Sequence, residues 1–392
     1  MAKRSSKSAP RPKVLARPDD PRRAMPAEVP VSLDEIAGQQ AAKHNIRSAI
    51  ASGRVHHAWI FHGPPGVGKF TTALAFAAVI LDPSTAPDLA GELRPDPDSE
   101  VQALLRAGTH PDLHVVRKEL ARFSEDRQTR ERKLLTIPKE VVEQHLLEPA
   151  QRAANMPGWL ARKVFIVDEA ELLDRSPTNA PVQNALLKTL EEPAPGTVII
   201  LVTSNEERLL PTIRSRSQRV GFAPLNEAEM RAWIRARGIE IPPGEEEWAM
   251  RYAQGSPGRL LEAVETGVLG WRRLIEPRIR ARIEGRYDPL LGPTLAGLAD
   301  EWAGEHVKRG EAVGENRSKE AANREAAARV LAVVAEMARD ALRQPHLAES
   351  AAALIDAVLV AERRLAANVQ MPFVFEELAA PPLPPAPAGF RR

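Results

Sequence analysis

The stretch Gly63-Pro64-Pro65-Gly66-Val67-Gly68-Lys69, followed by Phe70 and Thr71, decides the fold class of this chain. It comes directly after a short apolar run, residues 58–61, and directly before residues 72–81, which have the composition of a helix. A strand, a glycine-rich turn and a helix in this order form the context of a phosphate-binding loop. In such a loop the backbone N–H groups point at phosphate oxygens, and the lysine reaches the terminal phosphates. The sequence therefore predicts a nucleotide cradle made of residues 63–71.

One position departs from this motif. The residue after the lysine is normally Ser or Thr, whose hydroxyl holds Mg²⁺, and here it is Phe70. A phenyl ring cannot bind a hard cation that requires oxygen ligands. Thr71 has a hydroxyl, but it is turned about 100° further round the helix. We therefore expect a degraded site that could still hold ATP or ADP but has no metal ligand.

Composition limits the class of protein. The chain has 392 residues, enough for two or three domains, with 43% hydrophobic and 27% charged residues. It has no cysteine, which excludes disulfides and cysteine-bound zinc and fits a reducing cytoplasm. No run approaches the roughly 18 apolar residues of a membrane span, so no membrane association is expected. The net charge of +2 does not by itself indicate nucleic-acid binding.

Apolar runs alternate with helical patterns up to residue 223. The predicted strands are residues 58–62, 113–116, 164–167, 198–202 and 219–222. Continuous Val and Ile runs are typical of parallel strands that are buried on both faces. The alternation predicts a doubly wound α/β domain with a five-stranded parallel sheet. We expect a surface excursion at residues 82–100, a helix within 137–154, and a mobile loop or helix in the densely charged stretch 117–132.

Two polar groups follow predicted strands. Asp168 and Glu169 come directly after residues 164–167, where ligands of open α/β sheets bind. The aspartate can hold Mg²⁺ and the glutamate can polarise an attacking water. The alternative is that Asp168 caps the next helix, but the phosphate loop upstream favours the functional layout. Ser204, after the strand 198–202, is placed to sense a γ-phosphate or to orient water.

From Pro224 the pattern becomes wholly helical. We divide the chain into a disordered basic arm (1–30), the α/β domain (31–223), a helical lid (224–270), C-terminal helices (271–375) and a Pro-rich tail (376–392). The arm is either a solvated tail or a salt-sensitive contact with DNA phosphates. Arg259, in the run Gly255-Ser256-Pro257-Gly258-Arg259 of the lid, is placed among the nucleotide-binding residues.

Several motifs in this order resemble the clamp-loader subunits of the AAA+ superfamily over about residues 31–370, and the delta-prime type among them. The motifs are Ile36-Ala37-Gly38-Gln39, residues 63–69, His110-Pro111-Asp112-Leu113, Asp168-Glu169, residues 184–193 and Thr212-Ile213-Arg214-Ser215-Arg216.

The resemblance implies a hetero-pentameric ring with delta and gamma/tau subunits. Such a ring is part of the DNA polymerase III holoenzyme and loads a sliding clamp onto primed DNA. In this family the C-terminal helices form an oligomerisation collar. Arg216 resembles the arginine finger that reaches the ATP of the neighbouring subunit. A guanidinium suits this role because it is always charged and can bind two phosphate oxygens at once. The delta-prime type acts as a stator whose own site is degraded, so we expect no intrinsic ATPase and an idle Glu169.

The sequence departs from the family pattern at two places, and three alternative functions remain. Many relatives carry a four-cysteine zinc module after the phosphate loop, and residues 82–100 occupy that place here. Ser217 stands where Cys is usual, which leaves Arg216 intact. An active gamma/tau-type ATPase would need a hydroxyl at position 70. An independent AAA+ motor acting on DNA would also need a working metal site. In a phosphate-loop kinase the helical lid and the Ser215-Arg216 motif would have no purpose.

Overall fold

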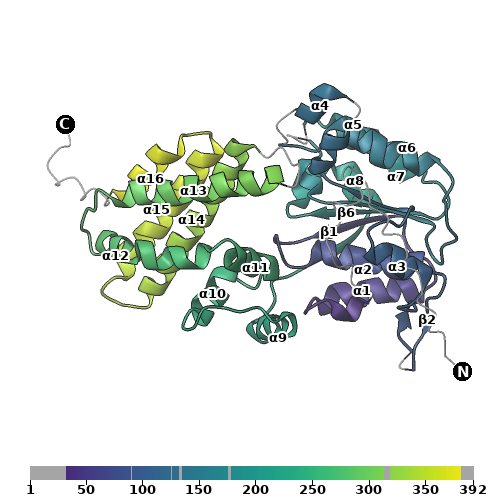
Figure 1. The fold of residues 1–392 in the computed structure, drawn as a ribbon, viewed down its shortest axis with the longest axis horizontal. Coiled ribbons are helices and arrows are strands. Elements are labelled where there is room, and N and C mark those ends of the chain that lie inside the picture. Colours follow the sequence, from purple (N-terminus) through teal and green to yellow (C-terminus); the bar gives the residue numbers. More distant parts are fainter. Residues whose placement is uncertain are drawn as a thin grey trace, which may run out of the picture.

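The structure is a computed structural model that describes residues 32–89, 91–124, 126–131, 135–174, 178–312 and 318–380 (Figure 1). The predicted basic arm (1–30) and residues 381–392 of the Pro-rich tail lie outside the described residues. Figure 1 shows a half built around a sheet and a half built of helices, which meet near α11 (Pro257–Glu265). No helix in the described ranges is long and apolar enough to cross a membrane.

A five-stranded parallel sheet organises the first half, as predicted. The strands lie in the order β4-β5-β6-β1-β7. Their bounds are β1 Ala58–His62, β4 Leu113–Val116, β5 Lys163–Val167, β6 Thr197–Thr203 and β7 Gln218–Gly221. Every residue of β5 and β6 is buried, because helices cover both faces of the sheet, and this explains their continuous apolar sequences.

Side chains that alternate along each strand pack into two different cores. On one face, Trp59, Ile166 and Ile200 belong to a core that they share with the helices α1 (Gln40–Ala51) and α2 (Lys69–Leu81). On the other face, the neighbouring residues Ile60, Phe165 and Leu201 belong to a second core. Three further helices of this half are α3 Glu100–Arg106, α7 Pro181–Glu191 and α8 Pro211–Arg216.

The segments between these elements are less regular. The excursion at 82–100 carries a short hairpin, β2 Ala86–Pro87 with β3 Leu93–Arg94. The described part of 117–132 forms a 3-10 helix, Lys118–Phe123, and the short helix α4, Arg127–Glu131. The helix predicted within 137–154 is divided into α5 Lys139–Val142, a π-helical turn Glu143–Leu147 and α6 Glu148–Gln151. Pro149 in α6 has no N–H to donate and its ring crowds the preceding turn, which accounts for the wider turn before it.

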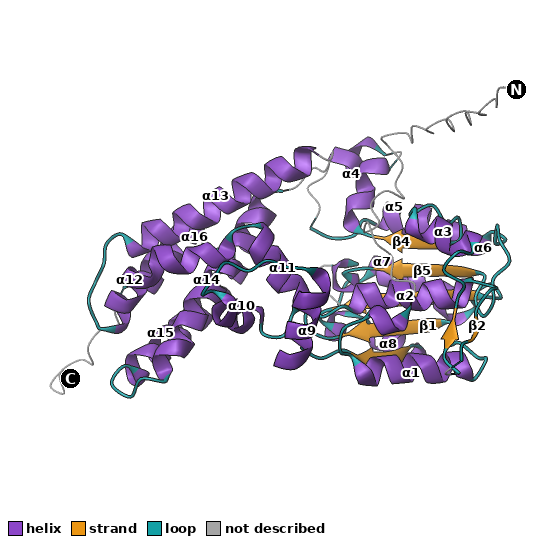
Figure 2. Ribbon diagram, turned by 60° about the horizontal axis from the view of Figure 1, so that its bottom comes forward, coloured by secondary structure: helices purple, strands orange, loops and turns teal. Residues whose placement is uncertain are grey.

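The second half is entirely helical among its described residues. The first three helices are α9 Glu227–Arg237, α10 Glu246–Ala253 and α11 Pro257–Glu265. They are followed by α12 Trp271–Ile283, α13 Leu291–Ala312, α14 Lys319–Leu342, α15 Ala348–Ala366 and α16 Met371–Ala379. One buried core runs through all of them, from Leu225 to Ala379. Figure 2 shows α11 between these helices and the carboxyl ends of the strands.

Candidate nucleotide site and arginine edge

The loop between β1 and α2 has the curled backbone of a phosphate cradle. Gly66 and Gly68 have φ of +73° and +97°, a left-handed region that side chains with a Cβ rarely adopt. Gly63 has φ +144°, and a Cβ there would lie 2.3 Å from the carbonyl oxygen of Phe222. The glycines are therefore required by the shape of this loop, and α2 begins at Lys69.

Lys69 points back into the loop and meets Ser204. Its Nζ donates to the carbonyl oxygens of Gly63 at 2.7 Å and Pro64 at 2.5 Å, and to Oγ of Ser204 at 3.2 Å. Burial lowers the pKa of Lys69 to about 8, against the opposing effect of Glu171 and Asp168. The structure therefore brings together the predicted phosphate lysine and the predicted sensor.

Asp168 is held by an arginine that the sequence pattern did not single out. Arg117 follows β4 and Asp168 follows β5, and the two strands pair in parallel. The Arg117 guanidinium lies 2.9 Å from a carboxylate oxygen of Asp168 and 4.1 Å above the centroid of the Phe70 ring. Burial raises the pKa of Asp168 although Arg117 opposes this effect. Arg117 thus connects the residue that replaces the metal ligand with the carboxylate predicted to hold the metal.

Glu169 is paired in a similar way. It lies 2.8 Å from the Lys118 ammonium, and its backbone adopts a left-handed φ of +51°. Burial has the largest single effect on Lys118 and lowers its pKa, but the charge and hydrogen bond of Glu169 together with the charges of Glu119 and Glu325 raise the pKa overall. A third carboxylate, Glu171, accepts a hydrogen bond from the Ser204 N–H at 3.2 Å.

These residues do not fit a magnesium ion. Phe70 offers no oxygen, and Arg117 already takes a carboxylate oxygen of Asp168. No group of three or more His, Asp or Glu side chains placed to hold a metal was found within the described ranges. The loop fits phosphate better, because the first N–H groups of α2 have no acceptor within the helix and Lys69 is at hand. The residues that would hold phosphate are Gly66, Val67, Gly68 and Lys69 together with Phe70 and Thr71 at the start of α2.

The lid contacts the tip of the loop directly. Ser256 Oγ donates to the carbonyl oxygen of Pro65 at 3.0 Å, and the N–H of Gly258 donates to that of Gly66 at 2.9 Å. A Cβ on Gly258 would lie 2.9 Å from Cα of Gly66, so that only glycine permits this approach. The Arg259 guanidinium lies 4.4 Å above the Tyr252 ring, and its backbone N–H donates to Oγ of Ser256. Among the described residues, no recorded hydrogen bond joins the Arg259 side chain to the phosphate loop.

Arg216 lies at the other end of the sheet. It is the last residue of α8, separated from β7 only by Ser217, and its side chain is exposed. Because β7 is parallel to β1, the start of β7 and the loop after β1 are separated by about one strand length, roughly 13 Å. The guanidinium lies 2.8 Å from the Glu191 carboxylate and donates to the carbonyl oxygen of Thr212 at 3.1 Å.

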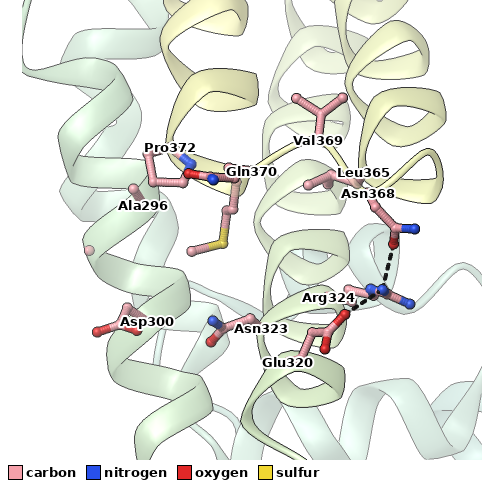
Figure 3. A pocket seen from close by; sticks show the side chains of 12 residues that line it. Ala296, Asp300, Glu320, Asn323, Arg324, Leu365, Asn368, Val369, Gln370 and Pro372 are labelled. Atoms are coloured by element: carbon pink, nitrogen blue, oxygen red, sulfur yellow. Dashed lines mark hydrogen bonds and ion pairs between the residues drawn. The ribbon is translucent and has the colours of Figure 1, made fainter. Parts of the chain in front are cut away.

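A hollow of about 620 Å³ lies elsewhere, between α13, α14 and the start of α16 (Figure 3). Figure 3 shows Arg324 on its wall, bonded to Glu320 at 2.7 Å and to Asn368 at 2.5 Å. None of its lining residues belongs to the predicted nucleotide site.

The amino-acid sequence of this chain is similar to those of known replication proteins. Residues 38–226 match the family model of the DNA polymerase III delta subunit. The DNA polymerase III subunit delta′ of Pseudomonas aeruginosa is 33% identical over 202 residues, which cover 51% of this chain and 53% of the relative. That of Escherichia coli is 30% identical over 211 residues, 54% of this chain and 55% of the relative. Residues 38–226 are therefore similar to DNA polymerase III clamp-loader subunits, and these matches support a clamp-loader subunit of the AAA+ family.

Both branches of this family are represented among the matches. The gamma/tau subunit of Mycobacterium tuberculosis is 29% identical over 245 residues, 62% of this chain and 38% of the relative. The chain therefore spans about half the length of its delta′ relatives, and less of the gamma/tau relative. A solved DNA polymerase III gamma subunit-related protein of Thermotoga maritima aligns with a TM-score of 0.43 at 14% identity, over 87% of this chain and 97% of that one.

Proposed function

We propose that this chain is a delta-prime-type subunit of a bacterial clamp loader that does not hydrolyse ATP itself. The observation that carries the proposal is the pairing at the degraded site. Phe70 stands in the metal-ligand position, and both carboxylates after β5 are paired with cations of this same chain, Arg117 and Lys118. A hydrolytic site would need Asp168 and Glu169 available to a metal ion and a water molecule.

In this proposal the chain contributes Arg216 to the ATP site of a neighbouring subunit. The present partner of Arg216 is easily exchanged, because the side chains of Arg216 and Glu191 are 40% and 48% exposed. An exposed pair of this kind stabilises a protein by about 0–1 kcal/mol. A neighbour's triphosphate offers a guanidinium a forked, charge-assisted contact that is stronger than this pair. The exposed position before β7 suits an arginine that acts outside its own subunit.

The partners in the proposal are delta and gamma/tau subunits in a hetero-pentameric ring, the sliding clamp and primed DNA, in the cytoplasm. The helices α12 to α16 would supply the contacts that hold the ring. The gamma/tau branch is the second candidate, since the match to the Mycobacterium tuberculosis protein is longer than the delta′ matches. Phe70 argues against it, because an active subunit requires a hydroxyl there.

Two measurements test the proposal. The native complex is purified through a tag on this chain, and the co-eluting proteins are identified; delta and gamma/tau subunits are expected. The isolated chain is then assayed for ATP hydrolysis, and none above background is expected. Robust Mg²⁺-dependent turnover by the isolated chain would instead favour the gamma/tau-type candidate.

A further inference from the structure

The pairing of Arg117 has a consequence for metal binding. We propose that Arg117 is a built-in substitute for the divalent cation of this site, so that Phe70 and Arg117 together, and not Phe70 alone, exclude Mg²⁺. The inference rests on the proposed function only in taking the site as non-hydrolytic.

The position of Arg117 supports this assignment. In phosphate-loop enzymes the cation lies between the residue after the loop lysine and the carboxylate after the neighbouring strand. Those two positions are Phe70 and Asp168 here, and the Arg117 guanidinium contacts both of them. A guanidinium suits the place because it can stack on a ring with its face and bind a carboxylate with its edge. Phe70 therefore provides a platform for the cation that replaces the metal.

Charge balance points in the same direction. Lys69, Arg117 and Lys118 supply three positive charges beside Asp168, Glu169 and Glu171, and Glu119 and Glu325 also act on Lys118, so Asp168 already has a cation of this chain beside it. Arg117 is only 25% exposed and Asp168 20%, so their attraction is screened less than that of a surface pair. An incoming Mg²⁺ would have to displace a guanidinium from a largely desolvated carboxylate. Restoring only a hydroxyl at position 70 would leave that barrier in place.

The test is the Mg²⁺ dependence of ADP binding by the isolated chain, measured by calorimetry in Mg²⁺ and in EDTA. The native chain and Phe70→Thr are both expected to show no Mg²⁺-dependent component of affinity. Phe70→Thr/Arg117→Ala should bind ADP about tenfold more tightly in Mg²⁺ than in EDTA, the size of one regained charge-assisted contact. Electron paramagnetic resonance of Mn²⁺ with ADP reads the metal itself, and immobilised Mn²⁺ is expected only in the double variant.

The inference is overturned if Phe70→Thr alone gains as much Mg²⁺ dependence as the double variant, or if the native chain binds ADP only with Mg²⁺. Phe70→Thr/Arg117→Gln covers the case in which alanine prevents folding, because glutamine keeps a long side chain without the charge, and it should also gain Mg²⁺ dependence; Phe70→Thr/Arg117→Lys, which keeps a cation beside Asp168, should remain independent of Mg²⁺. Arg122→Ala is the matched control, since Arg122 also lies over a phenyl ring, that of Phe123 at 4.5 Å, outside the nucleotide site. Combined with Phe70→Thr, it should create no Mg²⁺ dependence. These results are separate from the proposed ring function, which depends on Arg216.

Discussion

The two ends of the parallel sheet carry arginines in opposite situations. At the carboxyl end, Arg117 lies between Phe70 and Asp168 and is three-quarters buried. At the amino end, Arg216 is exposed and its carboxylate partner, Glu191, is also exposed. The first arginine has its charge neutralised inside the subunit, whereas the second can exchange its partner at little cost.

Because of this difference, substitutions at the two ends of the sheet should affect different properties: stability at the carboxyl end and binding at the amino end. Removing one member of a buried ion pair leaves the other uncompensated, so changes at the carboxyl end should lower stability. Changes to an exposed arginine should leave stability nearly unchanged and act on what binds there. The following predictions concern the free energy of unfolding and run from the largest expected change to the smallest.

The contact between the lid and the phosphate loop should be the most sensitive. In Gly258→Ala the new Cβ would lie 2.9 Å from Cα of Gly66, and neither backbone can move freely. We expect a loss of about 3 kcal/mol, measured by urea unfolding. Gly304→Ala is the control, because a Cβ there meets nothing within 4 Å, and it should stabilise α13 by about 0.5–1 kcal/mol. Equal effects of the two substitutions would contradict the docking of the lid on the loop.

Arg117→Ala should lower the free energy of unfolding by about 2 kcal/mol, roughly half the cost of breaking a fully buried ion pair, since both partners retain some solvent contact. Arg117→Ala/Asp168→Asn should recover part of this loss, because the unpaired carboxylate is then gone. If the single and double variants are equally stable, the pairing of Arg117 with Asp168 contributes little.

The buried ammonium of Lys69 predicts a dependence on pH. Its pKa is about 8 in the folded chain, against an ordinary value of 10.5. Between these values the unfolded chain binds more protons than the folded chain, so stability should rise with pH over that window. The stability of the native chain relative to Lys69→Met should therefore increase by about 1–2 kcal/mol from pH 7.5 to 10, after allowance for solvent screening. Lys118→Met should show no such rise, because the pKa of Lys118 is raised and its contribution is lost only at higher pH. A flat difference for Lys69 would mean that its charge is fully solvated.

Arg216→Ala should change the free energy of unfolding by less than about 0.5 kcal/mol, as expected for an exposed pair. Thermal and urea unfolding of the isolated variant check this value. A loss comparable to that of Arg117→Ala would show that Arg216 is a structural residue.

Much of the fold follows from sequence pattern. Buried parallel strands need continuous apolar runs and the phosphate loop needs its glycines, so residues 58–62 and 63–69 were predictable in place and type. The interruption of the helix in 137–154 depends on how Pro149 affects the turn before it, which periodicity does not report. The single core shared by α9 to α16 could not be predicted either, because it depends on packing between segments that are distant in the sequence.

The cations beside Asp168 and Glu169 were missed for a similar reason. Arg117 and Lys118 stand in a charged stretch to which the sequence assigned no role. Their positions become informative only when β4 is known to lie beside β5, because residue 117 then falls next to residue 168. A guanidinium directly after a strand, combined with an aromatic residue in the metal-ligand position, is the signal that could have indicated the pair.

The measurement that tests the account most directly compares the two ends within a rebuilt loader. The complex is assembled with the native chain, Arg216→Ala, Arg216→Lys or Lys69→Ala, and DNA-dependent ATPase stimulated by the clamp is measured together with clamp loading. An arginine finger contributes on the order of 10³–10⁵ in rate at a single site of other phosphate-loop enzymes, and the whole loader should lose less because it has several sites. Arg216→Ala and Arg216→Lys should both be strongly impaired, since a point charge does not reproduce the forked contact, and Lys69→Ala should be mild. If Lys69→Ala abolishes activity while Arg216→Ala has no effect, the chain hydrolyses ATP for itself and the account is wrong.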